Sequence, residues 1–122
     1  METEENEEKW VTHCTNLNIY TSFTLGVCER VVKNRADGKT DRKALGRLVA
    51  AIIVRSHWQA QARMLEDALP ELDGDLRELA DQGLENYRQA DDALWETMKL
   101  VADELPHVEI VYDANVHWGS SK

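Results

Sequence analysis

Residues 75–105, DLRELADQGLENYRQADDALWETMKLVADEL, hold the pattern that decides the fold. Within this stretch one set of positions recurs in alternating steps of four and three, and all of them except Asp91 are apolar or aromatic. Such spacing aligns side chains along one face of an α-helix and is typical of a seam that packs against other helices. We therefore predict one long helix, ended by Pro106. The seam consists of Ala80, Leu84, Tyr87, Asp91, Leu94, Met98, Val101 and Leu105.

Two earlier stretches also carry helical patterns. Residues 10–35 place apolar and small polar side chains at four-three spacing, from Trp10 through Cys14, Leu17 and Thr21 onward. The second stretch, residues 41–69, is apolar on more than one face, which is typical of a central or interface helix. We predict that Thr40 caps its start and that it stops before Pro70.

The connectors and ends complete the predicted architecture. Asp75 is expected to cap the third helix, with Glu78 completing a capping box. Residues 1–8 are predicted to be a flexible acidic lead, residues 108–112 a short extended C-terminal arm, and residues 113–122 a tail. The sequence thus predicts a single all-α domain of 122 residues, with three long helices in an antiparallel bundle.

The formal net charge of −9 is unevenly distributed along the chain. Residues 29–63 hold nine Lys or Arg and three acids, whereas residues 66–113 hold fifteen acids and three basic residues. Either the basic and acidic helices pack together, or one of them faces a partner. The acidic molecule would repel a polyanion, so direct nucleic-acid binding is disfavoured. The regularly spaced carboxylates of the third helix could instead imitate a phosphate backbone, and this alternative stays open.

The sequence also indicates a compartment. No apolar run approaches the ~20 residues of a membrane span, and the Glu-rich start is not a secretory signal. Cys14 and Cys28 are fourteen residues apart on one helix. That separation is about 21 Å, too far for a disulfide within that helix. We therefore expect a cytoplasmic protein with two reduced, buried thiols and no membrane association. The alternative for the two cysteines is a bridge or metal site across a dimer.

Motifs with an established catalytic mechanism do not occur in the sequence. It contains no glycine-rich phosphate loop, nucleophile elbow, two-histidine zinc helix or calcium loop. The Cys and His residues are scattered, and Pro106 interrupts the Glu104-to-His107 spacing that would resemble half of a di-iron motif. We therefore predict neither a metal nor a cofactor, and no catalytic residue.

One polar cluster calls for an explanation. Arg55, His57 and Trp58 follow directly on the apolar run 50–54, and Asp91 occupies a seam position. A lone buried carboxylate is costly, and a guanidinium can bind a carboxylate at two points. In one interpretation, Arg55 and Asp91 form a structural pair that sets the helix register. In a second, Arg55, His57 and Trp58 hold an anionic ligand such as a nucleotide opposite Asp91, between the second and third helices. In a third, Asp91 is simply exposed at the edge of the bundle.

Several aromatic side chains have no evident place in a monomer's core. Trp95 lies one residue off the seam, and Tyr112 and Trp118 lie in the C-terminal segment. Such residues are enriched in protein interfaces, so we assign these three to a candidate protein interface. The broad apolar surface of residues 41–69 further predicts a homodimer, with the second or third helix at its interface.

These observations favour a non-enzymatic, acidic, helical module that binds another protein, as a small inhibitor or adaptor. A stand-alone inhibitor of the kind that phages use against host defences would have this composition. The alternative is a helical bundle that binds an anionic small molecule. An enzyme built on the same pocket ranks last, because one His and one Asp supply too little chemistry.

Overall fold

The computed structural model describes residues 2–105, with side chains from Glu7 onward. Four helices account for most of these residues, and no strand occurs among them, so the predicted all-α class is confirmed. The elements in chain order are α1 (Glu2–Ala36), α2 (Arg42–Ile53), α3 (Arg55–Ala68), the 3-10 turn η1 (Leu69–Glu71), α4 (Gly74–Leu100) and the 3-10 turn η2 (Ala102–Glu104).

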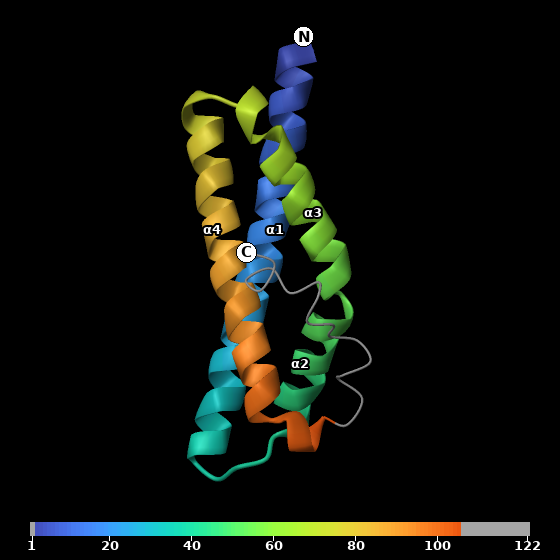
Figure 1. Ribbon diagram of the computed structural model, residues 1–122, viewed down its shortest axis with the longest axis vertical. Coiled ribbons are helices and arrows are strands. Elements are labelled where there is room, and N and C mark those ends of the chain that lie inside the picture. The colour runs from blue at the N-terminus through green and yellow to red at the C-terminus, as the bar shows by residue number, and fades with distance from the viewer. Residues whose placement is uncertain (1, 106–122) are drawn as a thin grey trace.

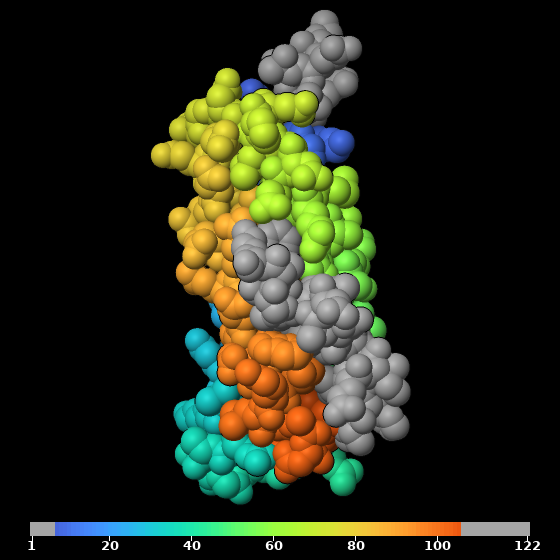
Figure 2. Space-filling view, viewed as in Figure 1, coloured from blue at the N-terminus to red at the C-terminus, as the bar shows by residue number. Residues whose placement is uncertain are grey.

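The helices form an elongated bundle in which α1 spans almost the whole length (Figure 1). Its most extensive contact is with α4, and α2 and α3 follow one another alongside it. The first turns of α1 extend beyond the connector between α3 and α4 (Figure 1). On the face seen in Figure 2, α3 and α4 lie in front over the upper part, and α1 shows near its start at the top and along the lower left edge.

The predicted count of three long helices is wrong, because residues 41–69 form two helices. Val54 lies between them with φ −89° and ψ 0°. It ends a run of three β-branched residues, 52–54, whose stiff side chains lower helix propensity. At this break the Tyr20 hydroxyl of α1 donates a hydrogen bond to the Ala51 carbonyl. The predicted arm at 108–112 and the tail at 113–122 lie outside the described residues.

The first helix begins earlier than predicted. It starts at Glu2 rather than near Trp10, so residues 2–8 belong to α1 and are not a separate lead. Five of the first eight residues are Glu. Glutamate is a good helix former, and its charge is favourable near the positive end of the helix dipole.

The caps of two other helices also differ from the predictions. Asp41, not Thr40, caps α2, because its Oδ1 accepts hydrogen bonds from the backbone N–H groups of Lys43 (3.0 Å) and Ala44 (3.3 Å). Helix α4 starts at Gly74 without a side-chain cap hydrogen bond, so the predicted Asp75 cap is wrong. The positive φ of Gly74, +59°, is a conformation that favours glycine.

The predicted seam is buried along its whole length, including its last two residues beyond the end of α4. The core behind it divides into two apolar clusters. One contains Leu48, Ile52, Leu94 and Met98, and the other contains Leu17, Leu65, Leu84 and Tyr87. Buried polar residues from α1, α3 and α4 lie between the clusters along the chain, and they are Thr21, Thr24, Arg55, Gln59 and Asp91.

Candidate functional site

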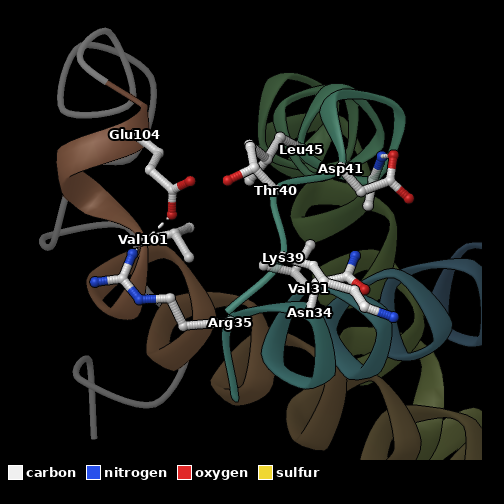
Figure 3. A pocket seen from close by; sticks show the side chains of 10 residues that line it. Val31, Asn34, Arg35, Lys39, Thr40, Asp41, Leu45, Val101 and Glu104 are labelled. Atoms are coloured by element: carbon white, nitrogen blue, oxygen red, sulfur yellow. Dashed lines mark hydrogen bonds and ion pairs between the residues drawn. The ribbon is translucent and has the colours of Figure 1, made fainter. Parts of the chain in front are cut away.

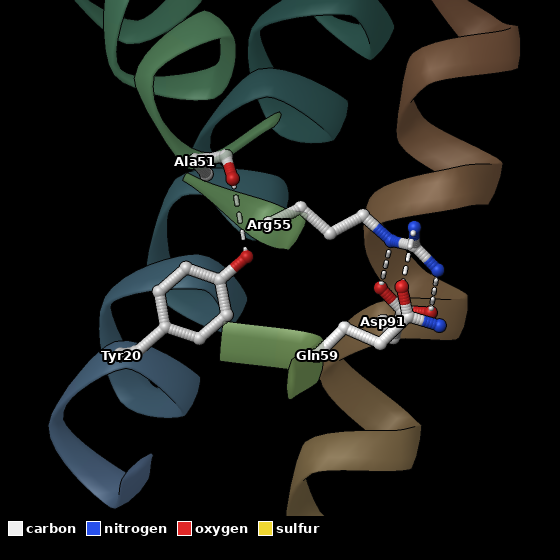
Figure 4. Close-up of polar contacts among 5 residues, drawn as sticks. All are labelled: Tyr20, Ala51, Arg55, Gln59 and Asp91. Carbon is white, nitrogen blue, oxygen red and sulfur yellow. Dashed lines mark hydrogen bonds and ion pairs between the residues drawn. The ribbon is translucent and has the colours of Figure 1, made fainter. Parts of the chain in front are cut away.

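The central polar contact joins Arg55, the first residue of α3, to Asp91 in the middle of α4 (Figure 4). Arg55 Nε donates to Asp91 Oδ1 at 2.7 Å, and Arg55 Nη2 donates to Asp91 Oδ2 at 2.9 Å. Arg55 Nη1 also donates to Gln59 Oε1 at 3.4 Å. The two charged residues are only 3% and 2% exposed. This two-point, buried geometry is what the structural interpretation of the sequence predicted.

The break at Val54 brings a second buried hydrogen bond into the same layer. In an unbroken helix the Ala51 carbonyl would accept from the backbone N–H four residues later, across Val54. In the structure the Tyr20 hydroxyl of α1 donates to that carbonyl at 3.1 Å (Figure 4). Tyr20 therefore supplies a donor to the end of α2 where the backbone turns into α3.

Burial dominates the chemistry of Tyr20. Desolvation raises the pKa of its phenol to about 12, with a smaller opposing effect from the Thr24 hydroxyl. The neutral, hydrogen-bonded phenol is thus the stable form over the whole physiological range. Tyr20 is a structural donor that sequence reasoning missed, because nothing in its local sequence shows that it faces the α2–α3 break.

The structure separates the other residues of the predicted ligand cluster. Trp58 is half-buried and stacks on Tyr20, with ring centroids 5.4 Å apart and an interplanar angle of 14°. His57 is exposed and packs edge-on against Trp58, with ring centroids 5.0 Å apart. Arg55 and Asp91 are therefore brought together, whereas His57 lies at the surface. An anionic ligand at Arg55 would have to compete with the carboxylate of Asp91, which binds two nitrogens of the guanidinium.

The turn between α1 and α2 lines a small pocket, together with Arg35 and Glu104 (Figure 3). Arg35 Nη1 lies 2.7 Å from Glu104 Oε2 and 3.4 Å from Asp103 Oδ1, so the end of α1 is tied to the acidic turn η2. The cavity volume is only about 10 Å³. That is space for roughly one water molecule, so this pocket does not suit a nucleotide-sized ligand.

Exposed acidic side chains lie along the first half of α4. Asp75, Glu78, Asp81 and Glu85 border a shallow groove of about 670 Å³ around Leu79. Asp81 pairs with Arg77 one turn away, at 3.3 Å, with both side chains substantially exposed. Exposed pairs of this kind contribute little to stability, and the surface keeps its predicted acidic character.

The outer face of α1 lacks charged residues over several turns. Residues 10–28 contain no Asp, Glu, Lys or Arg, although 30% of the whole chain is charged. Within this run Ile19 is 64% exposed and Phe23 is 43% exposed. We call this surface the α1 outer face, and its exposed residues are Val11, Thr12, Thr15, Asn16, Ile19, Ser22, Phe23 and Gly26.

The α1 outer face adjoins a groove between α1 and α2. Ser22, Phe23 and Gly26 form one wall, Ala44 and Arg47 line the other side, and the open space is about 520 Å³. Sequence reasoning attended to the buried seam of this helix and missed its outer side. The 19-residue run without charge was the signal that could have found it.

Of the three aromatic residues assigned to a protein interface, only Trp95 lies in the part of the chain that the structure describes. Trp95 is half-buried, packs against the apolar cluster that contains Leu94, and has Lys99 Nζ 5.7 Å from its ring centroid. Its ring is thus partly used within the bundle. Tyr112 and Trp118 lie outside the described residues.

No model of a known protein family, no curated protein and no solved structure matches this chain. Within residues 2–105, no helix is long and apolar enough to cross a membrane. Among the same residues, no group of three His, Cys, Asp or Glu side chains is placed to hold a metal ion. Fold and site together define a small all-α bundle with a buried Arg–Asp pair and one uncharged, exposed helix face.

Proposed function

We propose that this protein is a non-enzymatic interaction module of the inhibitor or adaptor type, and that the α1 outer face is its contact surface for a protein partner. The observation that carries the proposal is the exposed, uncharged run of α1. The centre of a protein interface is depleted of charged residues and enriched in aromatic ones. Ile19, which is 64% exposed, and Phe23, which is 43% exposed, supply the apolar contacts that such a centre needs.

The remaining polar groups support binding over catalysis. The buried pair is already committed to the bundle, since Asp91 occupies the Arg55 guanidinium. His13 Nε2 is 2.7 Å from the Gln61 carbonyl oxygen, so this ring contributes to the packing of α1 on α3. A general base must come within hydrogen-bond distance of the substrate proton that it removes, whereas His13 Nε2 already contacts the Gln61 carbonyl.

Site-specific cross-linking tests the proposal. A photoreactive benzoyl-phenylalanine placed at Thr15, in the α1 outer face, should give covalent protein adducts in cells that make the protein. The same group at Ser56, which is exposed on α3, is the matched control. Adducts that form from Thr15 and not from Ser56 are expected. If Thr15 gives no adducts, or only those that Ser56 also gives, the proposal is wrong.

A further inference from the structure

The charges along α1 change sign from one end of the helix to the other. Residues 1–9 carry five Glu and one Lys, residues 10–28 contain no Asp, Glu, Lys or Arg, and residues 29–35 carry one Glu and three basic residues, Arg30, Lys33 and Arg35. We propose that the partner on the α1 outer face is a second copy of this chain, with the two α1 helices packed antiparallel. The inference rests on the proposed function, because it names the occupant of that same face.

Antiparallel packing makes the two ends complementary. The uncharged run is centred on Ile19, so a two-fold axis there places residue i of one copy opposite residue 38 − i of its partner. In this register Glu8 of each copy lies opposite Arg30 of the other, and both residues are exposed. Parallel packing would instead place acids on acids and bases on bases, which is repulsive.

The exposed positions recur at the spacing that helix pairing needs. Glu8, Thr12, Thr15, Ile19, Ser22, Gly26, Arg30 and Lys33 succeed one another in steps of three or four. Such steps hold residues on one side of a helix over about 38 Å, at 1.5 Å per residue. The face is therefore a second seam, opposite the buried one and turned toward solvent in the single chain.

Gly26 lies on this face and leaves room for close approach. Glycine within a helix is unfavourable, and a Cβ at Gly26, as at Gly46 in α2, would meet nothing within 4 Å. The packing of the described residues therefore does not require a glycine at either position. In the antiparallel register Gly26 faces Thr12 of the partner, and a missing side chain lets two backbones come together.

The overall charge also favours this face. Two copies with a formal net charge of −9 each repel one another, and the repulsion is smallest where an uncharged surface is shared. The first turns of α1 project beyond the bundle (Figure 1), so they can reach the basic end of a second copy. This assignment differs from the sequence expectation, which placed the dimer interface on the second or third helix.

Equilibrium sedimentation of the full-length protein, with matched substitutions, tests the interface. Ile19 and Ile53 are 64% and 57% exposed, on α1 and α2 respectively. Wild type should sediment as a dimer with a micromolar or lower dissociation constant. Ile19→Asp should raise that constant at least about a hundredfold, whereas Ile53→Asp should leave it within about threefold. A monomeric wild type, or disruption by Ile53→Asp alone, would overturn the proposal.

A charge swap tests the antiparallel register. Glu8 and Arg30 are 22 residues apart on one helix, about 33 Å, so they cannot pair within a chain. Glu8→Arg and Arg30→Glu should each weaken the dimer about tenfold or more at low salt, and the double variant should regain most of the wild-type affinity. Losses that simply multiply in the double variant would exclude this register.

Cross-linking at Thr15 separates failure of this inference from failure of the proposed function. A self-adduct of about twice the chain mass of 14.0 kDa, formed by the purified protein alone, supports the second copy. Adducts only with a different protein, together with a monomeric wild type, leave the proposed function standing and overturn this inference. Finding no adduct from this face overturns both.

Discussion

Removing either member of the buried Arg55–Asp91 pair should destabilise the protein strongly. The side chains are 3% and 1% exposed, and their contact is 2.7 Å. Asp91→Ala leaves a guanidinium without its carboxylate, and Arg55→Ala leaves a carboxylate without its guanidinium. Breaking a buried pair on one side typically costs about 3–5 kcal/mol. For a domain of this size the melting temperature should fall by roughly 10–20 °C.

The double variant distinguishes a pair from two separate residues. Once one partner is gone, removing the second deletes a charge that is already uncompensated. We therefore expect Arg55→Ala/Asp91→Ala to cost at least about 2 kcal/mol less than the sum of the single losses. The apolar replacement Arg55→Met/Asp91→Leu should recover most of the lost stability, because buried pairs often tolerate such exchange.

Urea and thermal unfolding of the four variants provide the measurement, with an exposed pair as the control. Lys99 Nζ lies 3.0 Å from Glu96 Oε1, but these side chains are 50% and 70% exposed. Their coupling energy should stay below about 0.5 kcal/mol. If the Arg55 and Asp91 losses are additive and each below about 1 kcal/mol, the buried-pair reasoning is refuted. Unchanged stability of Arg55→Ala with loss of binding to an anionic ligand would favour the pocket interpretation instead.

Three further outcomes are expected. Tyr20→Phe should lower the free energy of unfolding by about 1–3 kcal/mol, because it leaves the buried Ala51 carbonyl without its hydroxyl donor. In wild type the Tyr20 pKa is raised from 10.0 to about 12. The contribution of Tyr20 to the free energy of unfolding is therefore complete below pH 10 and is lost as the pH rises through 12. Denaturation measured at high pH should show a weaker pH dependence in Tyr20→Phe than in wild type. Burial raises the pKa of Cys14 and Cys28, so a thiol reagent should modify both rapidly only after the protein is unfolded. If the unfolded protein, prepared without reductant, shows no reactive thiol, the two cysteines are not free. Gly26→Ala should raise the free energy of unfolding of the single chain by up to about 1 kcal/mol, measured at high dilution, and should weaken self-association. If the variant is instead less stable than wild type at high dilution, the glycine serves the chain's own fold.

Part of this structure was determined by the sequence alone. The four-three spacing over residues 80–105 fixes which side of α4 must be buried. The apolar residues form one stripe along the helix, and leaving that stripe in water would be unfavourable. Asp91 interrupts that stripe, and a carboxylate there needs a cation nearby, so Arg55 could be named as its partner. The all-α class and the burial of Cys14 and Cys28 follow from the same periodicity.

The tertiary structure decided what local patterns leave open. Residues 41–69 contain no Pro or Gly near Val54 that would end a helix, and the break there accompanies contacts made by Tyr20 from α1 and Asp91 from α4. Likewise, His57 adjoins Trp58 in the sequence but lies at the surface, because neighbouring helix residues point about 100° apart. The α1 outer face lies opposite the side of that helix that packs in the bundle. The periodicity of α1 predicts the packed side, but it does not say whether another segment covers the opposite one. That depends on the packing of distant segments, and periodicity within one helix does not contain that information.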